Sequence, residues 1–141
     1  MRGSSREGRR IVIVRSVILL AAVVVCVLLA GLAVFQLLLA SGRPLGRFAW
    51  GGQHEVLPRR LRFGSAVSVV SYGVIAAVVL QAADEIAVFP DGVADVGIWV
   101  VTGYFALGVP LNGISRSRPE RLVMTPVVLL LALCCLVVAL G

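Results

Sequence analysis

The chain has 141 residues, of which 60% are hydrophobic and only 14% charged, and its mean hydropathy is +1.03. Soluble domains are roughly half apolar and about a quarter charged, so this composition excludes an ordinary soluble fold and predicts a protein surrounded by lipid. The net charge of +6 comes from arginine alone, since there is no lysine; because the arginines flank apolar runs, we interpret them as topology signals and expect no nucleic-acid partner.

The first apolar run, residues 17–40, is interrupted only by Gln36. A bilayer core about 30 Å thick needs about 20 helical residues, so the run predicts a complete transmembrane helix. The basic N-terminal tail before it, residues 1–16, gives this part of the chain some likeness to a signal peptide. The apolar core of a signal peptide is only about 7–15 residues long, and we therefore expect a retained first helix.

Three more apolar runs follow, at about residues 65–83, 96–114 and 122–140. The turn sequence Phe89-Pro-Asp-Gly92 precedes the third. Before the fourth, Ser117-Arg-Pro-Glu120 matches a capping box, in which the serine and glutamate side chains each accept a backbone N–H at a helix start. The sequence predicts an all-α membrane protein, a bundle of four transmembrane helices in one domain, residues 17–141.

Small residues at four-residue spacing are expected where membrane helices pack together. Ala22, Cys26 and Ala30 form such a ladder in the first run, and Gly73 and Ala77 form one in the second. We interpret both ladders as packing seams, with a homodimer face as the alternative.

With four spans, the connection at residues 41–64 and the one near residues 112–121 share one membrane face, and the acidic second connection lies with both termini on the other. Eight arginines lie near the first face and five in the N-terminal tail. The whole-chain count favours a cytoplasmic location for the arginine-rich connections, whereas dominance of the first helix favours a cytoplasmic N-terminus. Both orientations stay open.

Polar side chains concentrate toward the face of the first and third connections. At 1.5 Å per residue, those within about two helical turns of it are Gln36, Ser65, Ser68, Asn112 and Ser115. Others fall deeper, namely Ser71, Tyr72, Thr102 and Tyr104. Because intramembrane polar groups avoid lipid, we expect a shallow polar cleft inside the bundle, open toward the first connection.

The most distinctive segment lies in that connection, Phe48-Ala-Trp-Gly-Gly-Gln-His-Glu-Val-Leu-Pro-Arg-Arg60. His54 is the only histidine, and histidine titrates near neutral pH; it and Glu55 either support the loop structurally or take part in binding. Glu55 suits Arg59, four residues on, as a surface pair. We expect Trp50 to anchor at the interface and Gly51-Gly52 to form a turn. The candidate binding residues are Trp50, Gly51, Gly52, His54, Glu55, Arg59, Arg62, Asn112 and Ser115; none is assigned a catalytic role.

The pattern Trp50-Gly-Gly-x-His54-x-x-Leu-Pro58-x-x-Leu-Arg62-x-Gly-Ser65, followed by Asn112-x-x-Ser115-x-Ser117-x-x-Glu120 and Met124-x-Pro126, resembles an uncharacterised family of small bacterial four-span membrane proteins. The likeness runs from about Gly46 into the fourth helix and leaves out the arginine-rich tail. The resemblance implies a four-span protein of the bacterial cytoplasmic membrane and does not indicate which reaction, if any, the protein catalyses.

Three classes of function fit the sequence. We favour a non-catalytic structural or accessory subunit, because no ionisable pair lies inside the membrane. A small transporter or channel is the second class, although coupled transport needs an intramembrane ionisable group and Asp84 and Glu85 lie only at a helix end. The third is a lipid-headgroup binding protein or membrane-face enzyme, with His54 as base and arginines holding phosphate.

The expected partners follow from the same composition. They are the lipid bilayer with its anionic headgroups, and a second copy of the chain or a larger membrane complex. The three cysteines, all within apolar runs and none at a metal-ligand spacing, predict small buried side chains, and neither a metal nor a cofactor is expected.

Overall fold

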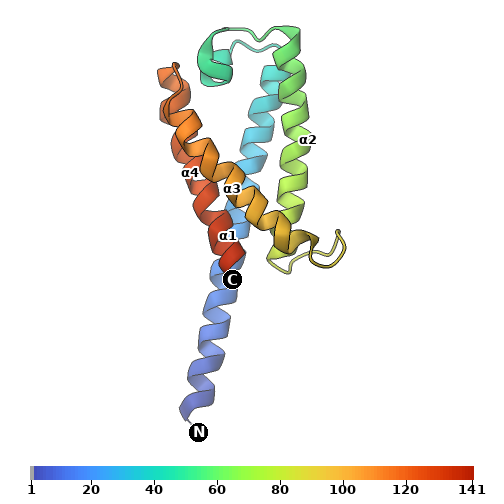
Figure 1. Cartoon of the computed structure of the whole chain (residues 1–141), viewed down its shortest axis with the longest axis vertical. Coiled ribbons are helices and arrows are strands. Elements are labelled where there is room, and N and C mark those ends of the chain that lie inside the picture. The colour runs from blue at the N-terminus through green and yellow to red at the C-terminus, as the bar shows by residue number, and fades with distance from the viewer. Residues whose placement is uncertain (1) are drawn as a thin grey trace.

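The computed structural model describes residues 2–141, with side chains from Glu7 onward. In this range the chain forms four long α-helices and two short 3-10 helices (Figure 1): α1 (Arg2–Ala40), η1 (Gly46–Phe48), η2 (Trp50–Gly52), α2 (Arg59–Ala82), α3 (Val93–Gly113) and α4 (Arg118–Leu140). Each of the four α-helices is long and apolar enough to cross a membrane. The predicted all-α bundle of four membrane-spanning helices is confirmed.

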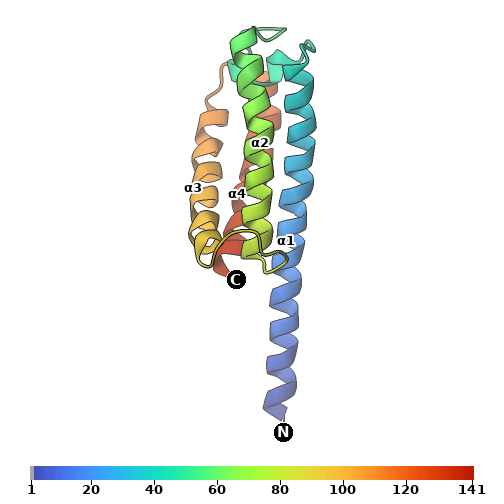
Figure 2. The ribbon, with the colours of Figure 1, turned by 90° about the vertical axis from the view of Figure 1, so that its right-hand side faces the viewer.

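The helices begin earlier than the apolar runs that predicted them. Helix α2 begins at Arg59, directly after Pro58, whose extended backbone (ψ 158°) ends the preceding loop. Residues 2–16, expected as a tail, are helical and continue without a break into the first span, so α1 projects well beyond the other helices (Figure 2). Apolar patterning marks the part of a helix that lies in lipid, whereas backbone hydrogen bonding continues into the headgroup layer and beyond.

The core lies between the four helices. Its fully buried members on α1, α2 and α4 are Ala22, Val25, Val79, Leu131 and Cys135, and α3 adds Ile98, Val101 and Phe105. The predicted seam on α1 is right at Ala22 and wrong at Ala30, which is exposed because the buried stripe continues through Leu29 instead.

The predicted seam on α2 is wrong for this bundle. Gly73 faces outward, and a Cβ added there would meet nothing within 4 Å. The buried side of α2 lies further along the helix, at Val78 and Val79.

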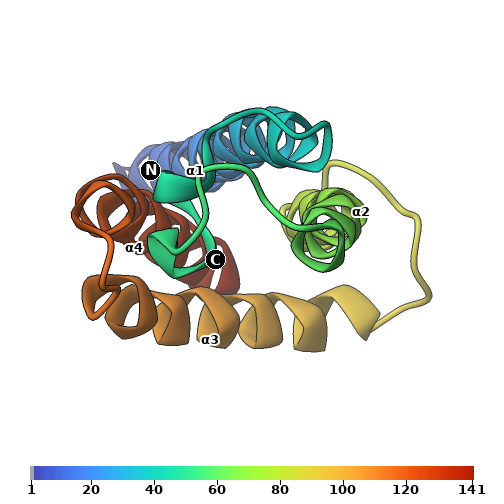
Figure 3. The same ribbon diagram turned by 90° about the horizontal axis from the view of Figure 1, so that it is seen from above.

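Helix α3 crosses the bundle obliquely and contacts different partners at its two ends (Figures 1 and 3). Near its start, a Cβ at Gly97 would lie 2.9 Å from a methyl group of Val78 on α2. Near its end, a Cβ at Gly108 would lie 2.9 Å from a methyl group of Val128 on α4. Helices α2 and α3 therefore meet beside the second connection and diverge toward the first and third connections.

The close contact at Gly97 predicts opposite effects for two alanine substitutions on the same helix. Gly97→Ala should lower the free energy of unfolding by about 1–2 kcal/mol, because the new methyl group overlaps Val78. A Cβ at Gly103 has open space around it, so Gly103→Ala should raise the free energy of unfolding by up to about 1 kcal/mol, because alanine has the higher helix propensity. Thermal unfolding in detergent measures both, and a Gly97→Ala protein as stable as Gly103→Ala would contradict the α2–α3 contact.

Candidate binding cavity

The first connection closes on itself before it reaches α2. The Gly46 N–H donates to the Glu55 carbonyl oxygen at 3.0 Å, and a Cβ at Gly46 would lie 2.0 Å from the His54 carbonyl oxygen. Arg62, from the first turn of α2, donates through Nε to the carbonyl oxygen of Ala40 at 2.7 Å. That bond satisfies a backbone acceptor that the end of α1 leaves free and ties the two ends of the connection together.

The Trp50-Gly51-Gly52 segment has three successive residues with positive φ, at 54°, 76° and 68°. Such angles are ordinary for glycine but cost about 1–2 kcal/mol for a residue with a side chain. Tertiary contacts of Trp50 offset this cost: its indole N–H donates to the Ser65 hydroxyl at 3.3 Å, and its ring lies against Gly64, where a Cβ would come within 2.9 Å.

The third connection holds this segment in place. Glu120 is only 9% exposed, and its Oε2 accepts the Gly51 N–H at 3.0 Å and the Ser115 hydroxyl at 2.5 Å. We call Gly51, Ser115 and Glu120 the loop staple. Beside it, the Ser117 hydroxyl donates to the Arg47 carbonyl oxygen. The predicted proximity of the first and third connections is confirmed.

The predicted capping box at the start of α4 forms only in part. Ser117 is the N-cap and its hydroxyl accepts the Glu120 N–H at 3.5 Å. The Glu120 carboxylate does not return to the Ser117 N–H, which instead donates to the Ser115 hydroxyl at 3.3 Å. The Glu120 carboxylate instead accepts a hydrogen bond from Gly51 in the first connection, 69 residues away in the sequence.

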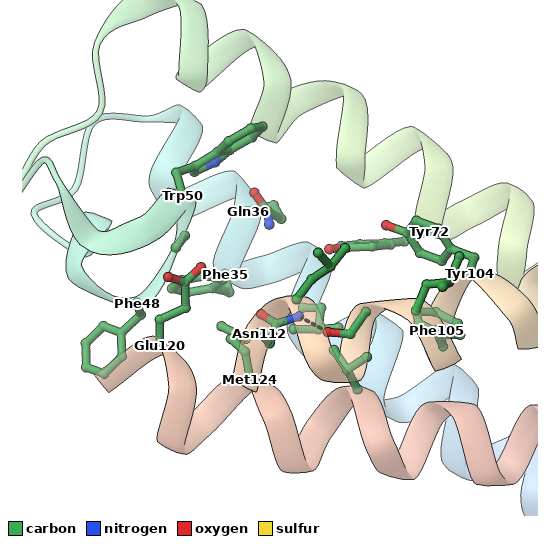
Figure 4. A pocket seen from close by; sticks show the side chains of 16 residues that line it. Phe35, Gln36, Phe48, Trp50, Tyr72, Tyr104, Phe105, Asn112, Glu120 and Met124 are labelled. Atoms are coloured by element: carbon green, nitrogen blue, oxygen red, sulfur yellow. Dashed lines mark hydrogen bonds between the residues drawn. The ribbon is translucent and has the colours of Figure 1, made fainter. Parts of the chain in front are cut away.

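A cavity of about 390 Å³ lies beneath the first connection, between the four helices (Figure 4). It contains six of the chain's nine aromatic side chains: Phe35, Phe48, Trp50, Tyr72, Tyr104 and Phe105. Its polar side chains besides the tyrosines are Gln36, Asn112 and Glu120. The predicted cleft therefore exists at the predicted face, but its lining is mainly aromatic and aliphatic rather than polar.

The polar side chains gather at the end of the cavity nearest the first connection. Glu120 and Gln36 lie near Trp50, whereas Tyr72, Tyr104 and Phe105 lie further along the helices, toward the membrane interior (Figure 4). The Asn112 amide donates to the Gly108 carbonyl oxygen of its own helix at 2.8 Å. The Gln36 Oε1 atom is buried and has no hydrogen-bond partner in the described chain, which leaves one acceptor free at the cavity wall.

The cavity opens sideways, beside α3. Tyr104, Leu107 and Leu111 line it and yet are 58%, 68% and 66% exposed. This is the half of the bundle in which α2 and α3 diverge (Figure 1). Since the outer surface of these helices is apolar enough to face hydrocarbon, a molecule dissolved in the membrane could reach the cavity without passing through water.

Five of the nine candidate residues lie at the cavity or in the loops that cover it. Trp50 and Asn112 line the cavity, Gly51 and Ser115 belong to the loop staple, and Gly52 is packed against Ser117, whose Cβ is 2.5 Å from the position that a Cβ at Gly52 would take.

The other four candidate binding residues do not line the cavity: three are exposed side chains, and the fourth donates a hydrogen bond to a backbone carbonyl oxygen. His54, Glu55 and Arg59 are exposed, and Arg62 donates to the end of α1. The expected pairing of Glu55 with Arg59 was an inference from helical spacing, and it does not apply because Glu55 precedes the first turn of α2.

One of the deeper polar residues, Ser71, does not point into the bundle, contrary to the expectation. Ser71 is exposed and donates to the Val67 carbonyl oxygen of its own helix at 3.1 Å, which satisfies it without a partner helix. Tyr104 lies at the cavity opening. Thr102 is buried as expected and donates to the Ile98 carbonyl oxygen.

Sequence reasoning missed Glu120 and the aromatic lining. Glu120 was interpreted as a helix cap, and its position three residues after Ser117 gave no sign of a distant partner. Phe35 next to Gln36 was the one available signal for the lining. Within the described residues no group of three histidine, cysteine or acidic side chains is placed to hold a metal ion.

Comparison with protein-family models, curated proteins and solved structures gave no match to this chain. The resemblance to small bacterial four-span membrane proteins therefore stays a prediction based on the motif, and the site has to be interpreted from its own geometry.

Proposed function

We propose that this protein is a non-catalytic, multi-pass protein of the bacterial cytoplasmic membrane that binds an amphipathic molecule from the surrounding lipid, as an accessory or structural subunit. The observation that carries the proposal is the aromatic-lined cavity with its sideways opening beside α3. A cavity of this size, mostly apolar with a few polar groups at one end, has the usual properties of a small-molecule site.

Binding is favoured over catalysis by the positions of the ionisable side chains. His54 is exposed, outside the cavity. Among the described side chains Glu120 is the one carboxylate in the cavity wall, and its Oε2 already accepts two hydrogen bonds, of which the one from Gly51 joins the first and third connections. A membrane-face enzyme would need a base beside a positioned partner, and the first connection holds His54 outside the cavity, away from Gln36, Asn112 and Glu120.

Binding can be tested with diphenylhexatriene, a rod-shaped neutral fluorophore that accepts energy from tryptophan. In a Trp99→Phe background, Trp50 in the cavity wall is the only donor. We expect saturable quenching of Trp50 at about one probe per protein in dodecyl maltoside micelles. Quenching that rises linearly with probe concentration would contradict the proposal.

Two double variants test whether the probe enters the cavity through the opening beside α3. Leu107→Phe/Leu111→Phe narrows it and should weaken probe binding by about tenfold, equivalent to about 1.4 kcal/mol. Val96→Phe/Val100→Phe is the matched control, since both valines are exposed on the same helix and neither lines the cavity. Equal effects of the two doubles would exclude entry beside α3.

A small transporter is the second candidate, and Glu120 favours it. Coupled transport generally uses an ionisable group within the membrane-spanning part; Glu120 supplies one in the first turn of α4 at a cavity wall, whereas Asp84 and Glu85 are exposed in the second connection. A proton-dependent flux in reconstituted vesicles that Glu120→Gln abolishes and Asp84→Asn/Glu85→Gln leaves intact would support transport. Absence of flux in vesicles containing folded protein would exclude it.

Two further partners follow from exposed residues. Arg59 and Arg60 are exposed at the start of α2, where anionic headgroups would contribute about 1 kcal/mol for each arginine. The exposed Gly73, with the half-buried Ala77 one turn further along, leaves a small-residue surface on α2 that suits a second copy. If that surface is the dimer interface, Gly73→Leu should convert a dimer to a monomer in analytical ultracentrifugation; an unchanged dimer would place the interface elsewhere.

A further inference from the structure

We propose that the ligand of this cavity is an organic cation, an ammonium compound with an apolar body, whose charge lies beside Glu120. This inference rests on the proposed binding function and adds the charge class of the ligand. Among the described side chains, Glu120 is the only charged one that lines the cavity. A ligand anion would be repelled by it, and a neutral ligand would leave the carboxylate without a counter-ion in a poorly solvated place.

The Glu120 carboxylate has capacity for a further partner. Both of its hydrogen bonds from the protein go to Oε2, and within the described side chains Oε1 receives no donor. The nearby arginines are directed elsewhere: Arg47 lies over the Phe48 ring at 4.8 Å, Arg62 donates to Ala40 and Arg121 donates to the Ser115 carbonyl oxygen at 3.5 Å. Arg116 and Arg118 are exposed.

The aromatic rings complete a site for a cation. The Trp50 side chain lies on the same side of the cavity as Glu120, and so does Phe48, of which Arg47 already covers one ring face (Figure 4). The faces of such rings attract ammonium groups, most strongly where water is excluded. The buried, unpartnered Oε1 of Gln36 adds a neutral acceptor at the same end.

The other end of the cavity suits the apolar body of the ligand. Tyr72, Tyr104 and Phe105 lie toward the membrane interior (Figure 4), and the exposed Leu107 and Leu111 continue this surface outward to the lipid. A molecule with its charge at Glu120 would therefore extend along α3 with its apolar part among these rings.

The test compares two probes that share one fluorophore. Diphenylhexatriene is neutral, and its trimethylammonium derivative carries a positive charge at one end. With Trp50 as the only donor in the Trp99→Phe background, in micelles of the uncharged detergent dodecyl maltoside, we expect the cationic probe to bind about tenfold more tightly than the neutral one. Glu120→Gln should remove this preference, so that the two probes bind about equally. The amide keeps an acceptor for Gly51.

Glu55→Gln is the matched control. Glu55 is an exposed carboxylate in the first connection, outside the cavity, so this variant changes the net charge equally on the same membrane face. It should retain the preference for the cationic probe. Loss of the preference in Glu55→Gln would overturn the assignment to Glu120, since a general surface charge would then account for it.

The results of the probe experiment distinguish failure of the cation inference from failure of the proposed binding function. Equal binding of the two probes to the unmutated cavity would overturn the cation inference and leave the binding function standing. Saturable binding of neither probe would overturn both. If Glu120→Gln fails to fold, the affinities of the two probes for the protein with Glu120 intact still decide whether the cavity prefers a cation.

An ammonium group could come from a lipid headgroup or from a free amphipathic amine. Displacement of the bound cationic probe by phosphatidylethanolamine, but not by phosphatidylglycerol, would identify a lipid ammonium as the source. Displacement by dodecyltrimethylammonium but by neither lipid would identify a free cation. Equal displacement by phosphatidylglycerol, which has no ammonium group, would contradict the proposal.

Discussion

Gly46→Ala is expected to release the first connection from its folded form, at a cost of about 3 kcal/mol. The added Cβ would lie 2.0 Å from the His54 carbonyl oxygen, and this oxygen belongs to backbone that cannot rotate away. The Gly46 N–H bond to Glu55 would be lost with the same movement. Trypsin cleavage after Arg47 measures the opening, and its rate should rise by about 100-fold.

Gly51→Ala is the control for this substitution. Gly51 has a positive φ, but a Cβ there would meet nothing within 4 Å, so only the backbone cost of about 1–2 kcal/mol applies. Cleavage after Arg47 should therefore rise less than in Gly46→Ala. A larger effect at Gly51 would show that backbone conformation, rather than close packing at Gly46, limits the stability of the loop.

Glu120→Ala should open the same connection from the opposite side. It leaves the Gly51 N–H and the Ser115 hydroxyl without their acceptor, and losing a charged acceptor at a buried site costs about 3 kcal/mol. Trypsin cleavage after Arg47 should again accelerate by about 100-fold, while thermal unfolding of the helices in detergent changes much less, because the staple contacts lie outside the main core.

Two other variants show whether this effect comes from the staple. Glu55→Ala removes an exposed carboxylate from the same face and should leave the cleavage rate within about twofold, since its side chain supports no contact across the loops. Ser115→Ala removes one of the two donors and should give a smaller increase than Glu120→Ala. If Glu120→Ala and Glu55→Ala behaved alike, Glu120 would not hold the connection.

The four helices could be predicted from the sequence because each apolar run is long enough to cross a bilayer and is separated from the next by turn or charged residues. The shared face of the first and third connections followed from the number of spans alone. The packing surfaces could not be predicted in the same way. In lipid both sides of a helix are apolar, so hydropathy does not distinguish the buried Leu29 from the exposed Leu20, or the buried Val79 from the exposed Val74.

The location of the site could be predicted from the sequence, but the side chains that line it could not. Trp50, Gly51, Asn112 and Ser115 were identified and do lie together. The rarity of His54 drew attention to a side chain that the fold leaves at the surface. The role of Glu120 depends on a contact between residues far apart in sequence, and the lining of the cavity depends on the angle at which α3 crosses the bundle; neither is encoded in a local pattern.

The unbroken course of α1 has a mechanical consequence. Its 39 residues correspond to about 58 Å at 1.5 Å per residue, roughly twice the thickness of the hydrocarbon layer. A stiff rod held at one end by its bundle partners acts as a lever: when bilayer thickness changes and the helix tilts to match it, its arginine-bearing end sweeps sideways through the water. A change in bilayer thickness would thus displace the arginines at the projecting end of α1.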